Sequence, residues 1–146
     1  MEPRTYSYDE AFKASLEYFD GDELAARVWV NKYAMKDSFG HIFEQSPDDM
    51  HRRLASELAR IEAKYPNPVP MEEIKHLLDH FRYIVPAGSP MTGIGNDYQI
   101  ASLSNCFVVG IDGNSDSYGA ILYLYEVKEQ LMKRRGVVGH YLSGVS

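Results

Sequence analysis

The residues of this 146-residue chain that could carry out chemistry include its single cysteine, Cys106. Cys106 lies in SLSNCFVVG, residues 102–110, where a polar turn becomes an apolar run. A lone cysteine at such a place commonly packs as a small hydrophobic side chain. A nucleophilic thiol needs a histidine or cation that favours the thiolate, and thiol redox chemistry needs a second thiol. Neither is near Cys106 in the sequence, so packing and reaction both stay open.

Two histidines form a second candidate group. His76 and His80 stand four residues apart, with Glu73 one turn earlier, and on a helix this spacing can chelate zinc. Apolar residues between them define a separate, buried face, so a solvated polar edge explains the same histidines. Because no third ligand motif accompanies them, we expect no metal site.

Two further motifs could contact anions. GIGNDY at residues 93–98 is rich in glycine, but it lacks the third glycine of the dinucleotide fingerprint and the Gly-Lys-Ser/Thr ending of the P-loop. KRR at residues 133–135 lies at the end of a predicted helix, where cations balance the helix dipole without any ligand. An anion-facing role for Arg135 stays open, because Arg135 lies beside a glycine turn.

The elements that position these residues begin with a helical region. Apolar residues recur at three- and four-residue steps, with Leu24 on one of the buried stripes, and Pro47 marks a helix start after Ser46. From Val85 to Gln99, glycines and prolines are spaced too closely for a helix. The predicted helices lie at residues 9–19, 22–35, 46–65 and 71–84.

The second half of the sequence predicts a different fold. An apolar run at residues 103–111 indicates a buried strand, and the turn after it offers Ser115 or Ser117 as a helix cap. Residues 118–135 have a helical period, with Leu122 and Tyr125 facing inward, and a second apolar run follows. Strand, helix and strand in this order predict a parallel βαβ unit.

We therefore expect a helical domain at residues 1–82 and the start of an incomplete α/β domain at residues 83–146. Two parallel strands leave unpaired edges, and the chain ends as the second strand begins. The net charge of −6 argues against nonspecific nucleic-acid binding. No apolar run approaches the length of a membrane span, and no signal peptide begins the chain, so the expected location is cytoplasmic.

Several motifs in order resemble the large, catalytic subunit of ribonucleotide reductases. GSPMTGIGNDYQIASLSNCFVVG is similar to that family's loop and first barrel strand, DSYGAI to the following helix start, and LMKRRGVVGHYLS to the opening of the second strand. The region from Tyr8 to Tyr83 resembles the family's helical N-terminal domain. The implied fold is mainly α with α/β: a helical domain followed by the first βαβ unit of a ten-stranded α/β barrel, truncated. The sequence most resembles the adenosylcobalamin-dependent, diphosphate-type branch.

The resemblance implies roles for individual residues. Cys106 would be one of the two cysteines that reduce the ribose by radical 2′-deoxygenation. The start of the helix after the first strand would bind a specificity-setting deoxynucleotide or ATP, through Asp116 and Ser117, at a dimer interface. The residues implied for substrate binding are Ser89, Asn105, Arg135 and Gly136.

The resemblance also implies partners and cofactors. The radical would come from adenosylcobalamin or, alternatively, from a separate dimetal subunit. The substrate would be a ribonucleoside diphosphate, and the electrons would come from a thioredoxin-type thiol donor. The radical cysteine and the second redox cysteine would belong to the remainder of the reductase chain, so we expect the isolated chain to be inactive. A homodimer is a further expected assembly.

Three departures from the family pattern, one of them the altered tail SGVS, keep an alternative open. Val137 stands where the family has a second glycine, and its side chain could obstruct a nucleoside that approaches the backbone. Tyr141 replaces an expected acidic residue. The alternative is a non-catalytic remnant that pairs with a complementary or full-length chain.

Overall fold

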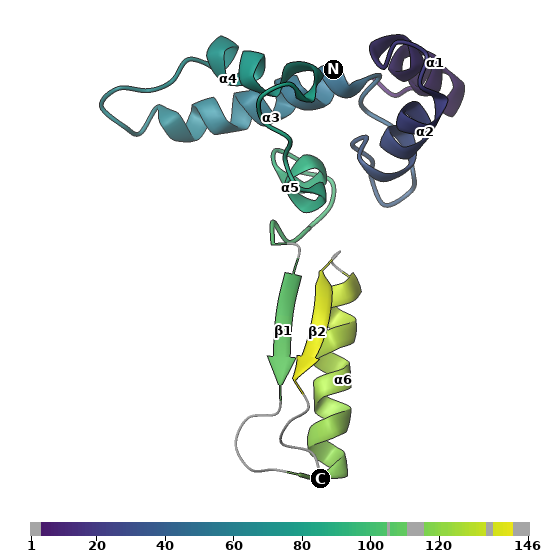
Figure 1. Ribbon diagram of the computed structural model, residues 1–146, viewed down its shortest axis with the longest axis vertical. Helices are drawn as coiled ribbons and strands as arrows, with labels where there is room; N and C mark the ends of the chain where they lie inside the picture. Colours follow the sequence, from purple (N-terminus) through teal and green to yellow (C-terminus); the bar gives the residue numbers. More distant parts are fainter. Residues whose placement is uncertain (1–3, 105, 111–115, 134–135, 142–146) are drawn as a thin grey trace. The chain divides into compact units, whose positions relative to one another are not determined.

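A computed structural model describes residues 4–104, 106–110, 116–133 and 136–141 (Figure 1). Contacts divide the chain after Ile100 into two compact units. The first unit thus continues past the domain boundary expected after Arg82. Among the described residues, no helix combines the length and apolar character needed to span a bilayer.

The first unit is built from helices around α3, which contacts α1 and α4. Its core contains Trp29, Val30 and Leu54, each at most 2% exposed. Leu24, expected on a buried stripe, is instead 72% exposed, because α2 turns Ala26, Trp29 and Val30 inward. The elements are α1 (Tyr8–Tyr18), α2 (Glu23–Lys32), α3 (Pro47–Glu62), α4 (Met71–Leu78), the 3₁₀ turn η1 (Asp79–Phe81) and α5 (Gly88–Gly93).

Local capping explains where the first helices begin. The Ser7 hydroxyl accepts from the Glu10 amide and the Glu10 carboxylate accepts from the Ser7 amide, which closes a capping box at α1. Asp22 caps α2 by accepting from the amide of Ala25 at 2.9 Å. Pro47 opens α3 at a position where its missing N–H has no intrahelical partner. These starts agree with the sequence expectations to within two residues.

The fourth helix is shorter than expected. It ends at Leu78 instead of continuing to Ile84, and the next turn has positive φ angles of 53° at His80 and 54° at Phe81. Tertiary contacts hold this unfavourable backbone: the His80 amide donates to the Tyr18 hydroxyl at 2.7 Å, and the Phe81 ring stacks on Phe19 at 6.1 Å. The apolar period of the sequence could not reveal contacts with a helix so distant along the chain.

The glycine-rich segment contains a helix that the sequence did not predict. Gly88 and Gly93 bound α5, and Pro90 lies in its first turn, where the absent proline N–H costs no hydrogen bond. Ile94 after the helix is already extended, and Gly95 follows with a φ of +69°, which glycine adopts without strain. The expectation that residues 85–99 lack a helix is therefore wrong for α5.

The second unit confirms the expected βαβ arrangement. Strands β1 (Cys106–Gly110) and β2 (Val137–Tyr141) pair in parallel, with Cys106 opposite Val137, and α6 (Tyr118–Lys133) connects them (Figure 1). Alternate residues of both strands are half-buried. One of them, His140, faces α6, where the Tyr125 ring lies edge-on to it with the ring centres 5.6 Å apart. A larger barrel around this unit stays a prediction.

The helix of the second unit turns differently from the expectation. Leu124 is its buried residue, at 3% exposure, whereas Leu122 is 52% and Tyr125 49% exposed. Since α6 packs against only two short strands, one narrow stripe is enough to cover them. The inward placement predicted for Leu122 is therefore wrong in this structure, whereas Tyr125 is half-exposed and its ring contacts His140 of β2.

Candidate functional site

The glycine-rich segment holds Ser89 in the first turn of α5. Ser89 is 3% exposed, and the Thr92 hydroxyl lies 3.2 Å from its carbonyl and 3.1 Å from that of Gly88. At the other end of the helix, the Asn96 side-chain amide donates to the Thr92 carbonyl at 3.1 Å. Hydrogen bonds within the segment thus pair several of its carbonyls around the buried serine.

A buried ion pair connects this segment to α3. The Arg53 guanidinium donates to the Glu44 carboxylate at 2.6 and 3.3 Å, to the Met91 carbonyl at 2.8 Å and to the Ile94 carbonyl. The Arg53 side chain is 9% exposed and that of Glu44 3%. Glu44 also accepts from the Met35 amide at 2.8 Å, so hydrogen bonds offset the cost of burying both charges.

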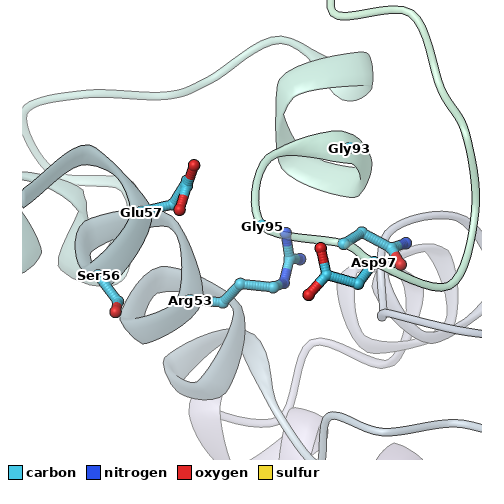
Figure 2. Close-up of a pocket in the computed structure, with 7 residues that line it drawn as sticks. Arg53, Ser56, Glu57, Gly93, Gly95 and Asp97 are labelled. Carbon is cyan, nitrogen blue, oxygen red and sulfur yellow. The ribbon is translucent and has the colours of Figure 1, made fainter. Parts of the chain in front are cut away.

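A polar cavity of about 330 Å³ opens beside this ion pair. In Figure 2, Arg53 extends from α3 toward the segment that carries Gly95 and Asp97. Glu57 on the rim pairs with Arg60 at 2.6 Å, which lowers the pKa of Glu57. Because the Arg53 charge is already bound by Glu44, this lining does not favour an anion. The lining residues are Arg53, Ser56, Glu57, Gly93, Gly95, Asn96 and Asp97.

In the second unit, the thiol lies beside the start of β2. Cys106 is the first residue of β1 and is exposed, and Gly136 directly precedes its strand partner Val137. A Cβ at Gly136 would lie 2.9 Å from the Phe107 ring and 3.0 Å from the Leu131 carbonyl, so only glycine fits there. The structure therefore brings Cys106 and Gly136 together at one edge of the sheet.

Val137 is also part of this edge. Its side chain is 65% exposed, and the alternating pattern places it on the same outer face as Cys106. Partner residues on adjacent strands lie roughly 5 Å apart. The Val137 side chain, which stands where the resemblance leads us to expect glycine, thus lies next to the thiol.

The two residues expected to bind an effector lie at the opposite end of α6. Ser117 caps the helix: its carbonyl accepts from Ile121 at 3.1 Å and its hydroxyl from Ala120 at 3.2 Å. Asp116 precedes it and is exposed. A helix of 16 residues is about 24 Å long, which separates Asp116 and Ser117 from Gly136. Asn105 and Arg135 lie outside the described residues.

A buried polar cluster joins α1, α3 and η1, and no sequence pattern pointed to it. His51 is fully buried, with Nδ1 3.2 Å from the Tyr18 hydroxyl and 3.8 Å from Asp79. Since the Tyr18 oxygen accepts from the His80 amide, its own proton is free for Nδ1, and His51 is then neutral. Lys75 bridges Asp48 and Asp79 at 2.8 and 2.9 Å.

Burial is the largest influence on the ionisation of His51 and Tyr18. It lowers the pKa of His51 to about 4, although Asp79 opposes the shift. Burial also raises the pKa of Tyr18. The nearby charges of Lys75 and Asp48 act on both groups. The cluster therefore holds η1 in place with a neutral histidine.

His76 and His80 do not form the ligand pair that their spacing allowed. α4 ends between them, and the His80 ring stacks on Tyr18 at 4.6 Å, while His76 lies against Tyr83 at 5.8 Å. Within the described ranges, no group of at least three His, Cys, Asp or Glu residues could hold a metal ion.

The fold places the chain in the class of helical domains that are followed by a parallel βαβ unit. Residues 19–99 match the model of the family described as "Ribonucleotide reductase, all-alpha domain". The match covers more than half of the chain, which therefore belongs to this family, and confirms the resemblance for the helical region. It ends before Cys106. No curated protein and no solved structure matches the chain significantly.

Proposed function

We propose that this chain provides the helical domain and the first thiol-bearing strand of a ribonucleoside-diphosphate reductase. The observation that carries the proposal is the family match over residues 19–99, followed directly by a βαβ unit whose first strand begins with Cys106. The family consists of oxidoreductases. The diphosphate substrate and the role of the thiol rest on the resemblance of the motifs around Cys106.

The proposed reaction uses Cys106 as one of two reductants. A thiyl radical elsewhere in the enzyme removes the 3′-hydrogen, and the 2′-hydroxyl leaves as water. Two thiols supply two electrons and two protons and end as a disulfide, and the 3′-hydrogen then returns from the radical cysteine. Since the chain has one cysteine, the second reducing thiol and the radical cysteine belong to the remainder of the reductase. An exposed thiol at a strand end is accessible to both.

We assign the proposed substrate site and the proposed effector site to opposite ends of the second unit. Gly136 would let the nucleoside approach the backbone near Cys106. The resemblance also assigns substrate binding to Ser89, Asn105 and Arg135. Asp116 and Ser117 would bind a deoxynucleotide or ATP effector in a homodimer. The length of α6 supports two separate sites, because a single nucleotide does not span about 24 Å.

The radical source stays a proposal in two versions, adenosylcobalamin or a separate dimetal subunit. No side chain among the described residues is assigned to either. Oxidised Cys106 would be reduced again by a thioredoxin-type thiol donor. This chain's own part in the reaction is to position the substrate and one thiol.

The proposal is tested by reconstitution. The full chain would be mixed with a chain carrying the remaining barrel, a ribonucleoside diphosphate, adenosylcobalamin and a dithiol, and deoxyribonucleotide would be measured. We expect product from the wild type and none from Cys106→Ser. Val108→Ser is the matched control, because it changes an exposed side chain on the same strand face without removing the thiol. Equal turnover by Cys106→Ser would contradict the proposal.

Val137 favours a second candidate function, a non-catalytic module that pairs with another chain. Its exposed side chain stands beside Cys106 on the outer sheet face. If the wild type associates with the barrel chain but forms no product, while Val137→Gly gains turnover, Val137 has closed the site. Turnover by the wild type would rule out this alternative.

A further inference from the structure

We propose that Arg53 is the positioning residue through which α3 holds the Ser89 segment in its binding conformation. The claim that this segment binds substrate rests on the proposed function. The claim that Arg53 sets its conformation rests on the contacts alone. Arg53 itself would touch no substrate, because its donors face Glu44 and two backbone carbonyls.

The first step is that α5 cannot hold its own shape. Six residues form less than two helical turns, and such a helix is not stable in isolation. Its terminal carbonyls need partners, and each one is bonded. The Pro90 carbonyl accepts from the Ile94 amide and that of Gly93 from the Asn96 amide. The Thr92 carbonyl accepts from the Asn96 side chain, and that of Met91 accepts from Arg53.

The second step is that Arg53 bonds the end of α5 from outside the segment. Its fork binds the carbonyls of Met91 and Ile94, which lie on either side of the helix end. Glu44 fixes the guanidinium from the other side through both carboxylate oxygens. A planar guanidinium held by four hydrogen bonds has one orientation, so the carbonyls it binds are fixed relative to α3.

The third step is that the segment is shaped to fit Arg53. At Gly95, a Cβ would lie 3.0 Å from Arg53 Cγ and 3.6 Å from the Arg53 carbonyl, and the φ is +69°. A side chain at this position would be strained and would also press on the arginine. Ser89 lies two residues before Met91 on the same short helix, so a shift at the Met91 carbonyl moves Ser89 with it.

The preceding residue provides a matched comparison. Arg52 lies on the same helix, but its side chain is 59% exposed and pairs with Asp48 at 3.0 Å. Exposed pairs of this kind contribute little to stability. Arg52→Met removes a guanidinium, with its charge and its donors, from the same helix without touching the Ser89 segment. Arg53→Lys keeps the charge beside Glu44 but cannot bind two carbonyls and both carboxylate oxygens at once.

The first measurement is amide hydrogen exchange on the full chain. For Arg53→Lys we expect residues 92–97 to exchange about tenfold faster, since bonds to a charged donor are lost. Protection of α1 to α3 and the melting temperature should stay near those of the wild type. Gly95→Ala should loosen the same residues from the other side, and Arg52→Met should change none of them. Wild-type protection at residues 92–97 in Arg53→Lys would overturn the proposal.

The second measurement uses the reconstituted reductase. Arg53→Lys should raise KM for the ribonucleoside diphosphate about tenfold and leave kcat within about twofold, because a displaced binding segment weakens binding before it affects chemistry. A merely structural loss would lower kcat at constant KM and would overturn the positioning role. If the wild type gives no turnover, the proposed function fails, and the exchange result still decides whether Arg53 holds the segment.

Discussion

Ser89 and Cys106, the two residues proposed to meet substrate, lie in units that hold them differently. Ser89 is 3% exposed on a short helix whose terminal carbonyls are bonded to Asn96, Arg53 and the local backbone. Cys106 begins a strand whose outer face is open, with Val108 82% and Val137 65% exposed. The first unit thus provides its own apolar cover and polar partners, whereas α6 covers one face of the sheet in the second. An apolar sheet face gains stability only from a surface that covers it.

The largest expected effect is on stability, when a buried side chain of the first unit and an exposed side chain of the second are each shortened to alanine. Leu54 is 1% exposed and Val108 82%. Leu54→Ala should lower the free energy of unfolding by about 2–5 kcal/mol, and Val108→Ala should change it by less than about 0.5 kcal/mol. Chemical denaturation of both variants measures the difference. A similar loss from Val108→Ala would show that the outer sheet face is already packed in the isolated chain.

The next effect concerns pH and is confined to the first unit. The pKa of His51 is lowered to about 4 by burial, while an unfolded histidine titrates near pH 6.5. Between these values the unfolded chain binds more protons, so stability falls as pH drops from about 6.5 to 4 and His51 causes no further loss below that. The full effect is about 3 kcal/mol.

His51→Gln serves as the test of this pH dependence. Glutamine can accept from Tyr18 without titrating, so this part of the pH dependence should disappear from denaturation curves measured between pH 4 and 7. An unchanged slope in the variant would mean that a group other than His51 causes the loss.

A smaller effect on stability is expected when each of two glycines in the second unit is replaced by alanine. Gly136→Ala should lower its stability by about 1–3 kcal/mol, because the new Cβ would lie 2.9 Å from the Phe107 ring and 3.0 Å from a backbone oxygen. At Gly119 in α6, an added Cβ would meet none of the described residues within 4 Å, so Gly119→Ala should stabilise the helix by about 0.5–1 kcal/mol. Exchange rates of α6 amides should move in opposite directions. Faster exchange in both variants would contradict the packing described at Gly136.

Local signals explain which parts of the fold could be predicted from the sequence. Asp22, Pro47 and Ser117 act within a few residues of themselves, and the helices start where these residues indicate. The βαβ unit was predictable because its strands, turn and helix follow one another along the chain. The family resemblance of the helical region is confirmed by the match over residues 19–99.

Contacts between distant segments explain what could not be predicted. α4 ends at Leu78 because Tyr18, far away in the sequence, binds the His80 amide. α5 forms because Arg53 binds its terminal carbonyls, and no periodicity reports such a bond. One signal was available: Arg53 follows Met50 by three residues on the buried stripe of α3, and a charged residue in that position needs a buried partner. That partner, Glu44, lies nine residues earlier, outside the helix.

The central claim is that Cys106 is one of the two reducing thiols, and its most direct test is a single turnover without added dithiol. The full chain and the chain carrying the remaining barrel would react, in the presence of adenosylcobalamin as the radical source, with one ribonucleoside diphosphate per complex. Peptides would then be analysed by mass spectrometry under non-reducing conditions. We predict one disulfide between Cys106 and a cysteine of the barrel chain for each deoxyribonucleotide formed. Deoxyribonucleotide formed while Cys106 stays a free thiol would contradict the account.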